Sequence, residues 1–130
     1  MATIFSRIIA GEIPGYTIAE DDNYYAFLDI NPLHEGHTLV IPKKETDYIF
    51  DMDDEEYQGL WQFAKKVALV LEKAIPCTRI GVAVIGLEVA HAHIHLVPIN
   101  NVHDIDFSRP KLNFTQEEFA ATREKILSKF

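Results

Sequence analysis

The chain has a single cysteine, Cys77, and no long apolar run. One cysteine excludes an intrachain disulfide, so we interpret Cys77 as a small hydrophobic side chain that is buried or partly buried. Residues 1–15 lack the apolar core and small-residue cleavage site of a signal peptide, and no run approaches the roughly 20 apolar residues that a membrane-spanning helix needs. We therefore expect a cytoplasmic protein without a membrane partner.

Basic residues are also scarce. The chain has 12 Lys and Arg against 20 Asp and Glu, for a formal net charge of -8. This excess of negative charge repels a polyanion, so we expect no nucleic-acid partner, whereas a small anionic ligand in a local pocket is compatible with it. The length of 130 residues, of which 48% are hydrophobic, suits one domain with a substantial core.

The first half of the chain predicts a helix, three strands and a second, longer helix. A short helix is predicted over residues 5–11, ending at Gly11, and the apolar runs 16–20 and 24–28 predict a hairpin. A further strand is predicted over 37–41. The longest helix is predicted over 52–75, because apolar residues recur there at helical spacing: Tyr57, Leu60, Trp61, Ala64, Ala68, Leu71 and Ile75. We interpret Trp61 as a core or dimer-packing residue.

The second half predicts two more strands and a final helix. The strands are expected over 79–85 and 92–97, the second ending at Pro98, and a polar connection is expected over 100–113. Thr115 and Glu118 form a capping box that opens the last helix. Because short turns join most of the strands, the pattern favours an antiparallel sheet and an α+β fold over a parallel α/β fold.

Three of the six histidines lie within five residues, at His91, His93 and His95. Side chains alternate between the two faces of a strand, so these three are expected to share one face. The apolar residues between them, Ala92 and Ile94, are expected to face a core.

Three interpretations of this histidine face compete. The first is an exposed face without a role. The second is a metal site, but the Cα atoms of His91 and His95 would lie roughly 13 Å apart in a straight strand. Ligand nitrogens lie about 2 Å from zinc, so a metal would need other ligands such as His37 or Glu88. The third is phosphate chemistry, in which imidazoles act as nucleophile, hydrogen-bond donor or general acid.

The His-x-His-x-His run resembles the histidine triad motif of the HIT superfamily of nucleotide hydrolases and transferases. Segments 4–9, 11–14, 27–32 and 36–43 look like the family's N-terminal pattern, in the same order. The resemblance covers roughly residues 3–98 of a single domain spanning 1–130, with 99–130 as a C-terminal extension. It implies a mainly antiparallel five-stranded sheet with a long central helix, a short N-terminal helix and a C-terminal helix.

The resemblance implies a hydrolase that releases AMP from a purine nucleoside phosphoramidate. His93 would attack the α-phosphate to give a nucleotidyl-histidine intermediate, which water then hydrolyses. Two alternatives stay open: a dinucleoside polyphosphate hydrolase or nucleotidyl transferase of the same superfamily, and a nucleotide-binding module with little turnover. The family also implies a homodimer whose sheets join across the two-fold axis, and we expect no cofactor.

Roles for the other site residues come from the same resemblance. His95 would contact the phosphate and help the leaving group, and the His91 backbone carbonyl would accept a hydrogen bond from the second ring nitrogen of His93. His37 would complete the cluster, and Asp29 would bind the ribose hydroxyls. The base pocket would be lined by apolar residues, which are Ile4, Phe5, Ile8, Phe27 and Ile30.

The sequence departs from the family pattern at several positions. Thr3 and Ser6 stand where many relatives have a zinc-binding cysteine pair, so we predict no structural zinc. Glu88 lies in the short link before the triad, where a carboxylate would repel a phosphate unless it points away or pairs with a histidine. Ile99 and Asn100 stand where an arginine often follows. The C-terminal helix is expected to cover part of the core or the site of a dimer partner.

Overall fold

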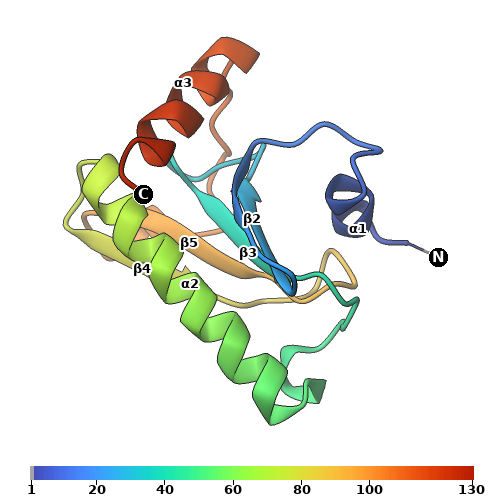
Figure 1. Ribbon diagram of the computed structural model, residues 1–130. Coiled ribbons are helices and arrows are strands. Elements are labelled where there is room, and N and C mark those ends of the chain that lie inside the picture. Colours follow the sequence, from blue (N-terminus) through green and yellow to red (C-terminus); the bar gives the residue numbers. More distant parts are fainter. Residues whose placement is uncertain (1) are drawn as a thin grey trace.

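The computed structural model describes residues 2–130, which contain a five-stranded antiparallel sheet and three α-helices (Figure 1). The strand order is β1-β2-β3-β5-β4, and every neighbouring pair is antiparallel. The predicted α+β class and the five-stranded sheet are confirmed. The strands are β1 (Thr17–Glu20), β2 (Tyr24–Leu28), β3 (Thr38–Pro42), β4 (Arg79–Ala83) and β5 (Ile94–Ile99).

One face of the sheet is covered by α2 (Asp54–Ala74), which crosses it diagonally in Figure 1. Asp53 caps the helix by accepting a hydrogen bond from the Glu56 N–H, and the acidic first turn suits the positive end of the helix dipole. The predicted long helix is confirmed with ends one or two residues inside those expected. Its core contact is broader than predicted, and the buried residues are Leu60, Phe63, Ala64, Val67, Leu71 and Ala74.

The opposite face carries a smaller apolar cluster and the short helix α1 (Ile4–Ile9). Alternate residues of β2 reach the two sides: Ala26 and Leu28 join the α2 core, whereas Tyr25 and Phe27 join the second cluster with Phe5 of α1. The predicted N-terminal helix is confirmed, but it begins at Ile4 and ends two residues earlier than expected. The turn after it uses Gly11 at a φ of 79°, a left-handed conformation that suits glycine.

The C-terminal helix α3 (Gln116–Leu127) packs against α2 and β1. Phe119 and Ile126 are buried in the main core, so the expectation that this helix covers part of the core is confirmed. The predicted capping box is also confirmed, because Thr115 and Glu118 each bond the other's backbone N–H. Two 3-10 helices were not predicted, η1 (Ile49–Asp51) and η2 (Val102–Ile105).

Strand ends at β4 and β5 differ from the sequence prediction. β4 ends at Ala83 rather than at 85, and β5 continues through Pro98 to Ile99. Pro98 is tolerated because the pairing of β3 with β5 ends at Leu96, so beyond it β5 pairs with β4 alone. Cys77 is partly buried, as expected. None of the helices described in residues 2–130 is long and apolar enough to cross a membrane.

Candidate active site

The triad lies where the chain enters β5, on the face opposite α2. Ala92, Ile94 and Leu96 join the α2 core, which confirms that the histidines share the other face. The exposed fractions of His91, His93 and His95 are 0%, 6% and 8%, so the interpretation of an exposed histidine face without a role is wrong about its exposure. The strand assignment is corrected as well: β5 begins at Ile94, so His91 and His93 precede the strand and only His95 lies within it.

His91 fastens the N-terminal segment to the site. Its Nε2 lies 2.7 Å from the Pro42 carbonyl oxygen, which can only accept, so Nε2 carries the proton. Its Nδ1 then accepts from the Thr3 hydroxyl at 2.8 Å. Burial lowers the pKa of His91, which favours this neutral form. Glu45 accepts hydrogen bonds from the Thr3 N–H at 2.7 Å and from the Ser6 hydroxyl at 2.6 Å. Thr3 and Ser6 thus take part in a hydrogen-bond network with Glu45 and His91.

His93 is oriented by the backbone of His91. Its Nδ1 lies 2.8 Å from the His91 carbonyl oxygen, so Nδ1 donates and Nε2 keeps its lone pair. This hydrogen bond is the one that the family resemblance predicts. The centre of the Phe5 ring lies 5.1 Å from that of the His93 ring, edge to face, and the centre of the His95 ring lies 4.9 Å from it. These contacts fix the plane of an imidazole whose free nitrogen is a potential nucleophile.

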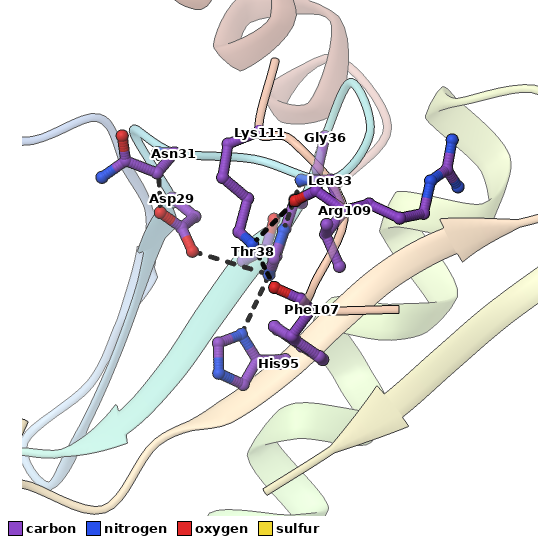
Figure 2. A network of polar contacts seen from close by, with 10 residues as sticks. Asp29, Asn31, Leu33, Gly36, Thr38, His95, Phe107, Arg109 and Lys111 are labelled. Carbon is purple, nitrogen blue, oxygen red and sulfur yellow. Dashed lines mark hydrogen bonds and ion pairs between the residues drawn. The ribbon is translucent and has the colours of Figure 1, made fainter. Parts of the chain in front are cut away.

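His37 and His95 form a directed pair behind His93. The Leu33 N–H donates to His37 Nδ1 at 3.0 Å, so the proton of neutral His37 is on Nε2. Nε2 lies 2.9 Å from His95 Nδ1 and donates to it, a contact drawn as a dashed line in Figure 2. The proton of neutral His95 is therefore on Nε2, the nitrogen that the pair leaves for a ligand.

Burial keeps this pair uncharged. It lowers the pKa of His37 to about 4, and the positive charge of Lys111 acts in the same direction, as His93 does when it carries a second proton. It also lowers the pKa of His95 to about 3, and the repulsion from protonated His37 or His93 and from Lys111 acts in the same direction. Burial raises the pKa of the Asp29 carboxyl, and this effect is opposed by a hydrogen bond from the Asn31 N–H, by His93 when it carries a second proton, and by the charge of Lys111. Near pH 7 both imidazoles are neutral hydrogen-bonding groups.

The spacing of the possible ligand atoms supports the metal interpretation, whereas the tautomer of His37 does not. One possible ligand atom each from Asp29, His37 and His95 lies within 4.8 Å of the others. His37 would have to coordinate through Nε2, yet its Nδ1 already accepts the Leu33 N–H. A neutral imidazole cannot use both nitrogens as acceptors, so ligation would break that bond or form an imidazolate. Glu88 is not part of this group. The hydrogen bonds favour a directed histidine pair over a metal centre.

A cleft of about 220 Å³ opens in front of His93 and His95. Asp29, Glu88, His93 and His95, which the sequence pattern singled out, line it, and so do Phe107 and Lys111, which no sequence pattern predicted. The Phe107 ring lies 4.6 Å from the His95 ring and 6.1 Å from the His37 ring. One sequence feature could have pointed to Phe107 and Lys111: both lie in the long polar connection predicted over 100–113, and a connection of more than about 12 residues is uncommon unless it is functional. The remaining lining residues are Asn31, Ile85, Gly86 and Leu87.

The five residues predicted to hold the base lie outside this lining. Ile4 and Ile30 are 48% and 61% exposed, whereas Phe5 and Phe27 are buried and Ile8 is partly buried. Their role in base binding stays a prediction.

Comparison with known proteins places this arrangement in a family. The family model described as "HIT domain" matches residues 10–102, more than half of the chain. The chain belongs to the HIT family. The triad, the cluster around it and the sheet that carries them are therefore features of a HIT-family protein, as the sequence resemblance predicted.

Individual relatives span most of the chain. An uncharacterized HIT-like protein of Borreliella burgdorferi is 38% identical over 124 residues, which cover 89% of each chain. The adenosine 5'-monophosphoramidase of Schizosaccharomyces pombe is 33% identical over 135 residues, covering 99% of this chain and 98% of its own. Among solved structures, a Hit-like protein from Bartonella henselae superimposes with a TM-score of 0.85 at 30% identity, over 98% of this chain and 96% of that one.

Proposed function

We propose that this HIT-family protein hydrolyses a purine nucleoside phosphoramidate and releases AMP, with His93 as the nucleophile. The observation that carries the proposal is the 2.8 Å hydrogen bond from His93 Nδ1 to the His91 carbonyl, which leaves the Nε2 lone pair free. Similarity to the S. pombe monophosphoramidase along nearly the whole chain supports the choice of substrate class.

The reaction would proceed in two displacements at phosphorus. His93 Nε2 forms a bond to the α-phosphorus while the P–N bond of the substrate breaks, and its electron pair stays on the leaving nitrogen, which takes a proton from water. A second water then attacks the phosphorus and gives its proton to the hydroxide left by the first, the bond to Nε2 breaks, and His93 regains its lone pair as AMP leaves. Covalent capture divides one difficult displacement into two easier ones.

His95 would act as a neutral hydrogen-bond donor to a phosphate oxygen. A pKa of about 3 leaves little imidazolium near neutral pH, so its role as a general acid is restricted in the free protein. His37 would hold the required tautomer, because its Nε2–H occupies His95 Nδ1 and leaves the His95 Nε2–H for the substrate. The pair thus supplies a preoriented donor at the phosphate.

The remaining groups of the cleft suggest how a nucleotide would lie in it. Asp29 would accept hydrogen bonds from ribose hydroxyls, while the exposed Ile4 and Ile30, with Ile8, would contact the base in front of buried Phe5 and Phe27. Glu88 lines the same cleft, and its carboxylate favours a departing amine over a departing polyphosphate. This charge is our reason to prefer a phosphoramidate to a dinucleoside polyphosphate.

We also propose the homodimer that the family resemblance implies. β4 is an edge strand of the sheet, so its outer hydrogen-bonding groups are available to a second copy, and Val82 on this strand is 48% exposed. Pairing of two β4 strands would extend the sheet across a two-fold axis.

Turnover of adenosine 5'-phosphoramidate in the presence of a chelator tests the proposed activity. The wild type is expected to release AMP, and His93→Ala is expected to lose activity by several powers of ten while it still binds AMP. His103→Ala, which alters an exposed histidine of η2, is the matched control. AMP binding without turnover would instead favour a binding module, and activity that needs added zinc would favour a metal mechanism.

A further inference from the structure

The connection between η2 and α3 turns back over the histidine cluster and brings Lys111 to the cleft (Figure 2). The Lys111 side chain extends from this connection toward the cluster, whereas the Arg109 side chain points away from it. Arg109 is engaged elsewhere, with the His103 carbonyl at 2.7 Å and the Asp104 carboxylate at 3.5 Å. Lys111 is therefore the side chain of this segment that reaches the site with a positive charge.

The ammonium group of Lys111 is held in place by its own connection. Nζ donates to the Phe107 carbonyl at 2.6 Å and to the Arg109 carbonyl at 3.3 Å, and it lies 5.9 Å from the centre of the Phe107 ring. An ammonium group has three N–H donors, so these two bonds leave one for a ligand. A charge positioned in advance loses little side-chain entropy when a ligand binds.

The side chains that line the cleft carry more negative than positive charge. Among the residues that line the described cleft, Lys111 is the only lysine or arginine, and two carboxylates, Asp29 and Glu88, face the same space. His95 is neutral near pH 7, as is His37 behind it. Without Lys111 an incoming phosphate would meet more negative than positive charge, in a chain whose net charge is already -8.

We infer that Lys111 is a substrate-binding residue, whose ammonium group recognises the anionic phosphate of the nucleotide. The inference rests on the proposed function for the identity of the ligand as a nucleoside phosphate. It supplies from the C-terminal connection a positive charge that the residues following the triad, Ile99 and Asn100, do not carry. Because Lys111 recognises the phosphate, the affinity for adenosine, which lacks that group, should not depend on Lys111.

A purely structural role for Lys111 would look different. If the lysine only fastened the connection through the two carbonyls, its loss would loosen Phe107 over His95 and would weaken every ligand of the cleft. The ratio of the affinities for AMP and adenosine separates the two cases, because a loose connection affects both ligands and a missing charge affects AMP alone.

The experiment compares calorimetric titrations of AMP and adenosine into wild type, Lys111→Met, Lys111→Arg and Lys66→Met. Lys66 is an exposed lysine of α2, so its variant removes the same charge far from the site in sequence. Lys111→Met is expected to weaken AMP roughly tenfold and to leave adenosine within about twofold of wild type. Lys111→Arg should restore most of the AMP affinity, and Lys66→Met should match wild type.

Two results would overturn the inference: equal losses for AMP and adenosine in Lys111→Met, or no loss for either. A wild type that releases AMP through His93 while Lys111→Met keeps the wild-type affinity ratio would refute the inference alone. A wild type that neither binds AMP nor releases it would refute the proposed function, and the role of Lys111 with it.

Discussion

Acidification is predicted to destabilise the protein between pH 7 and pH 5 through His37. This side chain is 1% exposed, and its neutral form is held by the Leu33 N–H on one side and His95 on the other. Burial lowers its pKa from 6.5 to about 4. Because the pKa is lower in the folded state, the unfolded chain binds more protons between these values, so stability is complete above pH 6.5 and falls as the pH approaches 4.

The size of the effect follows from the shift. A decrease of about 2.5 pKa units corresponds to ~3 kcal/mol, of which ~2 kcal/mol is lost between pH 7 and pH 5. His95, with a pKa of about 3, adds to the loss, but its titration is coupled to that of His37, so the two contributions do not simply add. Asp29 acts in the opposite sense at the acid end, because burial raises the pKa of its carboxyl and the folded state takes up that proton more readily.

Urea unfolding at pH 7 and pH 5 measures this loss for wild type and His37→Gln. Gln is uncharged at both values, and its side-chain carbonyl can still accept the Leu33 N–H, so the variant should lose ~2 kcal/mol less than wild type over this range. His103→Gln, in an exposed position of η2, should retain the wild-type dependence. Equal pH dependence in wild type and His37→Gln would refute the assignment of a buried neutral histidine.

Three further predictions concern packing, the N-terminal segment and assembly. Gly59→Ala should lower the free energy of unfolding by ~1–3 kcal/mol in thermal unfolding, because the new Cβ would overlap the Tyr24 hydroxyl. This overlap outweighs the gain of about 1 kcal/mol in helix propensity that alanine brings. A more stable variant would contradict this packing. Thr3→Val removes the cap of α1 and the hydroxyl that contacts His91. The variant should therefore lose ~1 kcal/mol of unfolding free energy in urea and release AMP more slowly. Unchanged stability and an unchanged rate would refute the hydrogen-bond network around Thr3. Val82→Lys should convert the proposed dimer to monomer in sedimentation velocity, and a dimer that persists would exclude pairing through β4.

Local patterns predicted much of this fold because their causes are local. The helical spacing of apolar residues predicted α2, and the Thr115 and Glu118 pair predicted the start of α3. Strict alternation around His93 predicted that the histidines share one face even though β5 begins only at Ile94. Alternation survives in extended backbone without strand pairing, which explains why the face was right and the strand boundary was wrong.

Contacts between distant parts of the chain could not be derived in this way. Lys111 and Phe107 reach the cleft only because η2 and the connection after it turn back over β5, and nothing local to those residues requires that path. Pro98 was expected to end its strand, but the strand continues because pairing with β3 ends at Leu96. The tautomers of His37 and His95 likewise depend on the Leu33 N–H, a contact set by tertiary structure.

The most direct test of the account is to trap the covalent intermediate. Wild-type protein is mixed with excess adenosine 5'-phosphoramidate in chelator, quenched within one turnover under alkaline conditions that preserve a phosphorus–nitrogen bond, digested, and analysed by mass spectrometry. The account predicts an adenylyl group on His93, absent from His93→Ala and lost as AMP when the reaction runs to completion. Rapid AMP release with no adduct at His93, or an adduct on another residue, would contradict it.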